Sequence, residues 1–195
     1  MKIVFATNNK FKFEEIKHKL GSNVELLNLS DIEFNGEIPE THETIEENAK
    51  EKAYYIYNRF HVDCFADDTG LEIDALNGEP GVYSARYAGD KCSFEDNMNK
   101  VLMKMKGIAN RKARFRTVIA LIEGGEFKMF EGIVNGEILN EKHGDSGFGY
   151  DPVFKPEGHQ LSFAQMSLEQ KNQISHRAIS INRLIDYLQN KYDRK

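Results

Sequence analysis

Apolar and polar positions switch along the chain between the spacing of a strand and the spacing of a helix. Residues 2–6 form a short apolar run typical of a buried strand, and residues 24–29 alternate as a second strand does. Between them, residues 10–20 carry apolar side chains three and four positions apart, which predicts a helix. Residues 44–60 predict a longer helix of the same kind, and residues 63–66 predict a short buried strand.

The second half of the chain continues this interleaving and adds a hairpin. Ser93 is a suitable cap for a helix, and an apolar stripe follows it. Residues 113–123 and 126–134 predict two strands joined by a turn of two glycines. Residues 175–190 predict a closing helix. Because helices and strands are interleaved, the pattern indicates an α/β fold with a mixed sheet rather than a purely parallel one.

Composition narrows the class of protein. The 195 residues suffice for a single domain, 1–195, and hydrophobic (40%) and charged (29%) residues occur in the proportions of a globular protein. The formal net charge of −5 argues against a strongly basic nucleic-acid binder. No apolar run approaches the ~18–20 residues of a membrane span. We therefore expect neither a nucleic acid nor a membrane as partner.

The cysteines and the first residues of the chain indicate the cellular compartment of the protein. Cys64 and Cys92 are the only cysteines, and they form no metal-binding or disulfide pattern. The chain starts with a strand-like run and lacks the apolar stretch of a secretory signal. These features predict a reduced, cytoplasmic protein.

A polar segment at the first strand-to-helix turn is a candidate phosphate site. Backbone N–H groups in the first turn of a helix favour an anion, and nearby hydroxyl, amide and ammonium groups can add to that attraction. The alternative is a capped helix with its lysines in solvent. The residues concerned are Thr7, Asn8, Asn9, Lys10, Phe11 and Lys12.

A pair of carboxylates follows the predicted strand 63–66. Asp67 and Asp68 lie where open α/β sheets bind ligands, at the carboxyl end of a strand, and Thr69 comes next. Adjacent carboxylates are costly unless a cation compensates them, and hard oxygen ligands suit Mg²⁺. One carboxylate could hold the metal and also orient a water. The alternative is a turn that caps the following segment.

The stretch 31–51 is strongly acidic, and such a stretch is usually a solvated surface. One or two of its carboxylates could nevertheless supply a second metal ligand. Glu47 and Asn48 are better placed than the rest, because they lie beside the apolar stripe of the predicted helix 44–60.

Two later segments are further candidate ligand sites, the first of them for a planar base. Residues 147–152 read Gly-Phe-Gly-Tyr-Asp-Pro, where glycines permit close approach and aromatic faces suit a planar ring. Ser175 is a suitable helix cap, which places His176 and Arg177 in a first turn where cations are disfavoured. Basic residues at a position that disfavours them, with Lys171 a few residues upstream, suggest an anionic or acceptor-rich partner. The alternatives are a structural turn and a surface pair at a frayed helix end.

Together these segments resemble one family, the inosine/xanthosine triphosphate pyrophosphatases, which clear deaminated purine nucleotides. Each motif is weak alone, but six in order along nearly the whole chain are specific. The family's T-x-N-x-x-K corresponds to residues 7–12, E-N-A to 47–49, A-D-D-[ST]-G to 66–70, P-G-x-[YF]-S-A-R-[YF] to 80–87, G-F-G-Y-D-P to 147–152 and S-H-R to 175–177.

The resemblance implies an elongated two-lobed α/β fold around a long mixed sheet with flanking helices and a central substrate cleft, usually in homodimers. It implies an enzyme that hydrolyses deaminated purine nucleoside triphosphates (ITP, dITP, XTP) to the monophosphate and pyrophosphate with Mg²⁺. The other interpretations are a pyrophosphatase for other modified nucleotides and a non-catalytic nucleotide- or RNA-binding module. The adjacent carboxylates argue against the last, since they repel phosphate without a metal.

The resemblance also implies residue roles. Asp68 would accept the proton of the attacking water and bind the metal, and residues 7–12 would hold the phosphates. Some relatives carry a glutamate ligand where this chain has Pro39, so the second metal ligand would be Glu40 or Glu47. The substrate, mostly its base and sugar, would be held by Thr69, Phe148, Gly149, Tyr150, Asp151, Lys171, His176 and Arg177, with Lys52 and Arg86 as further binding residues.

Overall fold

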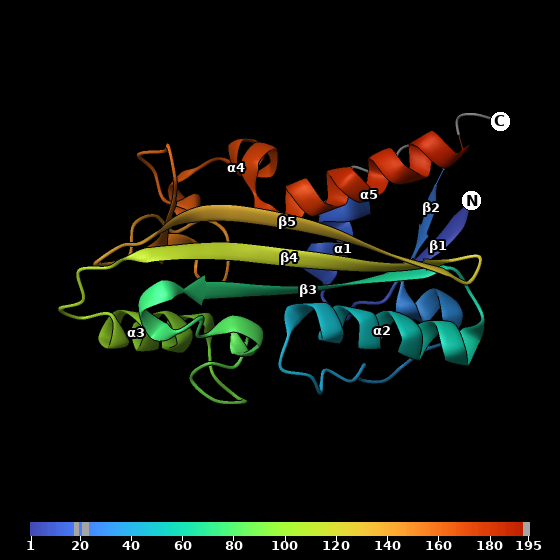
Figure 1. Ribbon diagram of the computed structural model, residues 1–195, viewed down its shortest axis with the longest axis horizontal. Coiled ribbons are helices and arrows are strands. Elements are labelled where there is room, and N and C mark those ends of the chain that lie inside the picture. The colour runs from blue at the N-terminus through green and yellow to red at the C-terminus, as the bar shows by residue number, and fades with distance from the viewer. Residues whose placement is uncertain (18–19, 21–23, 193–195) are drawn as a thin grey trace. The chain divides into compact units, whose positions relative to one another are not determined.

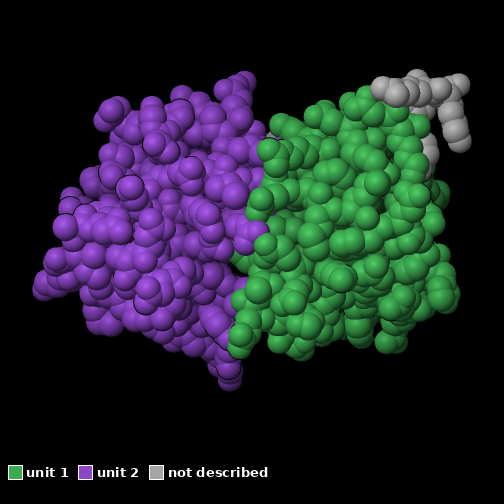
Figure 2. Space-filling view, in the orientation of Figure 1, with its two compact units in different colours: residues 1–68, 118–131, 180–195 green, residues 69–117, 132–179 purple. Residues whose placement is uncertain are grey.

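The computed structural model describes residues 1–17, 20 and 24–192. The chain forms two compact units (Figure 2). Unit 1 comprises Met1–Asp68, Val118–Glu131 and Ser180–Lys195, and unit 2 comprises Thr69–Thr117 and Gly132–Ile179. No helix in the described part of the chain is long and apolar enough to cross a membrane.

Six strands form one sheet in the order β2-β1-β3-β4-β5-β6. β1 pairs in parallel with both β2 and β3, whereas β5 and β6 are antiparallel, so the predicted mixed sheet is confirmed. The strands are β1 (Lys2–Phe5), β2 (Glu25–Leu27), β3 (Cys64–Ile73), β4 (Lys112–Glu123), β5 (Glu126–Ile138) and β6 (Phe154–Pro156). The helices are α1 (Lys10–Lys17), α2 (Ile45–Phe60), α3 (Phe94–Lys104), α4 (Leu168–Ile174) and α5 (His176–Tyr192).

In unit 1, helices cover both faces of the sheet (Figure 1). Side chains of β3 alternate between the faces, as a strand requires. Phe65 stacks on Phe5 with ring centroids 4.6 Å apart, in the core that α1 and α5 complete. Cys64 instead donates to the carbonyl of Ala53 in α2, 3.3 Å away. This explains why β3 consists of continuous apolar residues up to Ala66: both of its faces are buried.

Unit 2 has its own core, in which α3 packs on the sheet. The apolar stripe predicted for this helix is buried at Met98 and Val101, and it contacts the cluster that contains Leu71, Ile73 and Phe115. Helix α3 begins where predicted, because Ser93 accepts from the backbone N–H of Asp96 and completes a capping box. Unit 2 therefore places a helix against its own part of the sheet.

Several elements differ from the prediction: β6 was not predicted, and β5 runs to Ile138 instead of residue 134. β3 runs to Ile73 instead of ending at residue 66, so Asp67 and Asp68 lie inside a strand and not after it. Asp and Gly are poor strand formers, which is why the pattern indicated a break there. Helix α4 was not predicted, and it starts at a capping box formed by Ser167 and Gln170. The end of the helix predicted over residues 10–20 lies partly outside the described residues, because residues 18 and 19 are not described.

Candidate active site

The two carboxylates of β3 lie on opposite faces of the strand and have different partners. Asp67 faces α1, where the Lys12 ammonium lies 3.0 Å from Oδ1 and 2.8 Å from Oδ2. Asp68 faces α2, where its Oδ1 lies 3.4 Å from Nζ of Lys52 and its Oδ2 lies 3.5 Å from Nδ2 of Asn48. The strand therefore directs one carboxylate into each of two cationic environments.

Helix α2 brings two polar side chains to Asp68 from its buried face. Asn48 and Lys52 are four residues apart, so they lie one above the other on a helix. They are only 1% and 6% exposed, among the alanines of the apolar stripe. Thr44 caps the helix by accepting from the N–H of Glu47, which fixes the register of this face. The sequence placed Asn48 beside the apolar stripe as a possible metal-site residue, but its contact with Asp68 and the pairing of Asp67 with Lys12 were not predicted.

The structure distinguishes the two candidates for a second carboxylate. Glu40 Oε1 lies 2.5 Å from Nζ of Lys52, so Glu40 and Asp68 share one ammonium. Glu47 is exposed, and its carboxylate accepts from the Thr44 hydroxyl at the helix cap. The shared partner favours Glu40 over Glu47 as the companion of Asp68.

Burial dominates the electrostatics of this cluster. Burial raises the pKa of Asp68 above its ordinary value of 3.8, against the opposing effect of Lys52, and Glu40 raises it further. For Lys52, burial alone would lower the pKa, but Asp68, Asp67 and Glu40 together raise it above 10.5. Lys52 is therefore a firmly charged ammonium beside a carboxyl whose ionised form is disfavoured by its surroundings.

The donor set around Lys52 suits a hard divalent cation. Among the described residues, no group of three or more His, Cys, Asp and Glu side chains could enclose a metal. Mg²⁺ usually binds through one or two carboxylates together with waters and substrate phosphates. Asp68 and Glu40, which converge on one cationic partner, offer such a pair.

The strand-to-helix turn predicted to bind phosphate is organised by its own side chains. Thr7 Oγ1 accepts from the N–H of Asn9, and Asn9 Oδ1 accepts from the N–H of Lys12. Asn8 donates to the carbonyl of Gly36. Lys10 is exposed, and the side chain of Phe11 lies outside the described residues. This turn therefore contains both the helix capping named as the alternative and a cation, Lys12, that contacts Asp67.

In unit 2, Asp151 holds together the loop predicted to contact a base. Its Oδ2 accepts from the N–H of Phe148 at 2.9 Å and from Lys171 at 2.5 Å. Gly147 has a positive φ of 79°, and a Cβ there would lie 2.1 Å from the same oxygen. A side chain here would adopt a strained backbone conformation and displace the Asp151 carboxylate, so the loop favours glycine at this position.

The pair after Ser175 is buried rather than frayed. Ser175 Oγ accepts from the N–H of Ala178, which confirms it as the cap of α5. His176 and Arg177 are each 4% exposed. The imidazole of His176 stacks on Phe115, with ring centroids 4.6 Å apart. Burial of two basic side chains contradicts the alternative of a surface pair.

Lys171 and Arg177 meet at one aromatic ring. Nζ of Lys171 lies 4.9 Å from the centroid of Phe148, and Cζ of Arg177 lies 5.5 Å from it. Such distances are those of cation–π contacts. The residues predicted from two separate segments, 147–152 and 171–177, are thus brought together around the ring of Phe148.

The remaining predicted residues of unit 2 have structural partners. The Thr69 hydroxyl lies 2.8 Å from that of Thr117. The Tyr150 hydroxyl donates to the carbonyl of Ser84, and burial raises the pKa of Tyr150. The guanidinium of Arg86 lies over the ring of Tyr83, 5.5 Å from its centroid. The bond from Tyr150 to Ser84 ties the loop that carries Arg86 to the segment 147–152.

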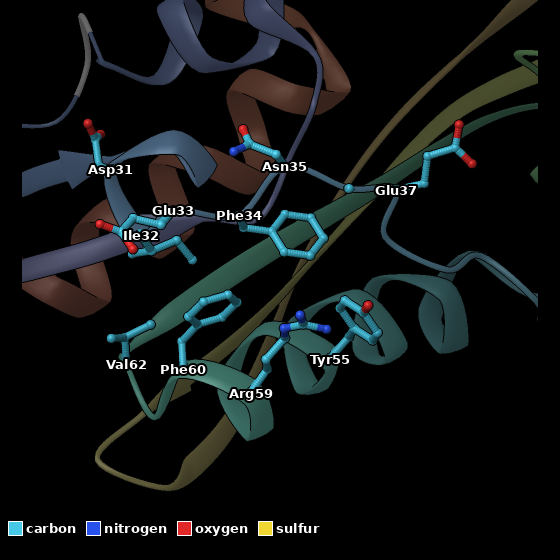
Figure 3. Close-up of a pocket in the computed structure, with 11 residues that line it drawn as sticks. Asp31, Ile32, Glu33, Phe34, Asn35, Glu37, Tyr55, Arg59, Phe60 and Val62 are labelled. Atoms are coloured by element: carbon cyan, nitrogen blue, oxygen red, sulfur yellow. The ribbon is translucent and has the colours of Figure 1, made fainter.

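A hollow of about 850 Å³ lies elsewhere in unit 1 (Figure 3). Arg59 lies across it, with its guanidinium 6.0 Å from the ring centroid of Phe34. Asp31, Glu33 and Glu37 also line it, and none of its described lining residues is a predicted site residue. Three carboxylates against one arginine disfavour a polyphosphate, so the volume of this hollow does not make it the candidate site.

Comparison with known proteins agrees with the arrangement of motifs. The model of the Ham1 family matches residues 3–187. A dITP/XTP pyrophosphatase of Christiangramia forsetii is 55% identical over 188 residues, which cover 96% of this chain and 99% of that protein. A dITP/XTP pyrophosphatase of Porphyromonas gingivalis is 50% identical over 188 residues, covering 96% of this chain and 97% of the relative.

Solved structures show the same fold. The Ham1 protein of Staphylococcus aureus superposes with a TM-score of 0.92 at 41% identity, covering 98% of this chain and 100% of that one. A HAM1 protein from Coxiella burnetii superposes with a TM-score of 0.93 at 35% identity, covering 97% of this chain and 99% of that one. With the family model, the sequence relatives and the structures in agreement over nearly its full length, the chain belongs to the Ham1 family.

Proposed function

We propose that this chain is a nucleoside triphosphate pyrophosphatase that hydrolyses deaminated purine nucleotides such as dITP, ITP and XTP to the monophosphate and pyrophosphate. The observation that carries the proposal is the buried cluster in which Lys52 joins Asp68 to Glu40 and Asn48 contacts Asp68. A buried carboxylate with a raised pKa beside a fixed cation is typical of a catalytic base. The names of the relatives, dITP/XTP pyrophosphatases, support the choice of substrate.

Asp68 is the base in this proposal. Its carboxylate takes a proton from a water whose oxygen attacks the α-phosphorus, and the bond from that phosphorus to the bridging oxygen breaks to release pyrophosphate. Asp68 and Glu40 would hold Mg²⁺, which would neutralise charge on the phosphate oxygens when bound. The ammonium groups of Lys12 and Lys52 add positive charge on either side of β3.

The aromatic and cationic residues of unit 2 suit the purine. The ring of Phe148 offers a face to a planar base, and Arg177 offers a fork of donors. A 6-oxo purine presents O6 and N7 as acceptors, whereas adenine presents an amino donor at position 6. Donors at this edge therefore favour hypoxanthine and xanthine over adenine by about 1–3 kcal/mol.

Assembly and location complete the proposal. The family resemblance implies a homodimer. Sedimentation equilibrium should then give a mass of about twice the 22.4 kDa of one chain. The two unpaired cysteines fit a reducing compartment such as the cytoplasm.

A substrate panel tests the proposed activity. Release of pyrophosphate is measured from ITP, XTP, dITP, GTP and ATP, with Mg²⁺ and with a chelator. We expect fast, Mg²⁺-dependent release from ITP, dITP and XTP, and a loss of about 10²–10⁴-fold in Asp68→Asn. Asp74→Asn, an exposed carboxylate of unit 2, is the matched control and should keep full activity. Equal rates in Asp68→Asn and the wild type would rule out Asp68 as the base.

A further inference from the structure

Phe94, the first residue of α3, lies next to the residues proposed to hold the base. Its side chain is 54% exposed. Its ring centroid lies 6.2 Å from that of Phe148, with the two planes inclined by 46°. A single exposed phenylalanine needs no explanation on its own. This one, however, contacts the same ring that Lys171 and Arg177 approach.

The backbone of Phe94 is held firmly. The capping box between Ser93 and Asp96 encloses it, with Ser93 N–H donating to Asp96 at 2.8 Å. One turn later, the buried amide of Asn97 accepts from the N–H of Ala88 at 2.7 Å. The start of α3 is therefore anchored both within the helix and to a neighbouring loop, and it gives the Phe94 ring a defined position.

Phe148, in contrast, sits between two permissive residues. Gly147 and Gly149 have φ angles of 79° and 64°, so the backbone that flanks Phe148 imposes little restriction on it. Its N–H is fixed by Asp151, but the orientation of its ring depends on neighbouring side chains. Lys142, five residues before Gly147, lies 2.6 Å from Glu95 in the first turn of α3, so the chain leading to Phe148 also contacts the start of this helix.

We propose that Phe94 is a positioning residue for the nucleotide base. It holds the ring of Phe148 in one orientation, so that the ring and the cations Lys171 and Arg177 form a preorganised surface for a planar purine. Phe94 acts through Phe148 and takes no part in the chemistry at phosphorus. This inference rests on the proposed function, because it assigns Phe148 to base binding.

Steady-state kinetics of Phe94→Ala test the inference. An aromatic pair of this kind predicts a rise in KM for ITP and XTP of about 2- to 12-fold, with kcat unchanged. Phe94→Tyr should restore the wild-type KM. Met103→Ala removes another exposed apolar side chain of α3, 69% exposed, and should leave KM unchanged. Inhibition by inorganic pyrophosphate, which has no base, should be the same in all these variants.

A double-mutant cycle adds a readout that a purely structural role would not change. In a Phe148→Ala background, Phe94→Ala should have no further effect on KM. An undiminished effect there, an equal effect of Met103→Ala, or a wild-type KM in Phe94→Ala would each overturn the inference. If the wild type released no pyrophosphate from ITP or XTP, the proposed function itself would fail. If the wild type were active and Phe94→Ala had the same KM as the wild type, only the role of Phe94 would be refuted.

Discussion

The ammonium of Lys12 contacts both carboxylate oxygens of Asp67, although the two residues are 55 positions apart. The side chain of Asp67 is only 2% exposed and that of Lys12 is 15% exposed, so this is a largely buried ion pair. The sequence suggested Lys12 as a phosphate ligand. In the structure its charge also compensates a carboxylate inside β3, and that second role has consequences for stability.

Removing Lys12 alone should destabilise the protein. Lys12→Ala leaves Asp67 buried without its partner, so we expect a loss toward the lower end of the about 3–5 kcal/mol seen when one member of a buried pair is removed. The double variant Lys12→Met with Asp67→Asn should recover most of this loss, since neither charge remains. Urea unfolding measures both. If Lys12→Ala were as stable as the wild type, the pair would be irrelevant to folding and Lys12 would act on ligands alone.

Substitution of the two candidate metal ligands, Glu40 and Glu47, should affect the Mg²⁺ requirement differently. Glu40→Gln should raise the Mg²⁺ concentration needed for half-maximal activity by at least about 10-fold, because it removes one of two converging carboxylates. Glu47→Gln is the matched control at an exposed helix cap and should leave that concentration unchanged. A Mg²⁺ titration of the rate decides between them, and the reverse ranking would transfer the ligand role to Glu47.

Asp68 should make stability depend on pH in the metal-free protein. Its pKa in the folded state is raised above 3.8, so the folded state binds its proton more tightly than the unfolded state does. The unfolding free energy therefore falls as pH rises through the unfolded and then the folded pKa. Asp68→Asn cannot ionise and should escape this fall. In urea unfolding with a chelator, we expect the stability advantage of the variant over the wild type to be smallest below pH 3.8 and to grow as the pH rises above that value; a difference that does not change with pH would contradict this.

The base loop offers a test of backbone geometry. Gly147→Ala places a Cβ 2.1 Å from Asp151 Oδ2, whereas Gly149→Ala meets nothing within 4 Å although its φ is also positive. We expect Gly147→Ala to raise KM for ITP about 10-fold or more, by displacing the contact that fixes Phe148. Gly149→Ala should cost only the backbone strain, about 1–2 kcal/mol of stability. Equal kinetic effects of the two variants would show that Asp151 does not organise the loop.

Local patterns in the sequence predicted most helices and strands, because the apolar spacing and the capping residues of an element lie within that element or next to it. The apolar stripe of α2 and the capping residue Ser93 are visible within one or two turns of helix, and both appear where expected. The full length of β3 was not predictable in this way. Asp67 and Asp68 break the strand pattern, and only the distant cations Lys12 and Lys52 make their burial tolerable.

The site was predictable to the extent that its residues form motifs. Asp68, the loop 147–152 and Arg177 belong to segments whose composition already suggested a nucleotide. The choice of Glu40 over Glu47 was not accessible, because it depends on which carboxylate the loop before α2 brings to Lys52. Its position beside the apolar stripe of the predicted helix 44–60 pointed instead to Glu47, whose carboxylate the structure uses at the cap of α2. The buried stacking of His176 on Phe115 likewise requires the folded chain.

The position of the broken bond tests the central claim most directly. ITP is hydrolysed by the wild-type protein in water enriched in ¹⁸O, and the products are separated and analysed by mass spectrometry. If a water activated by Asp68 attacks the α-phosphorus, the label appears in inosine monophosphate and the pyrophosphate is unlabelled. Label in pyrophosphate, or release of inorganic phosphate instead of pyrophosphate, would contradict the proposed pyrophosphatase reaction.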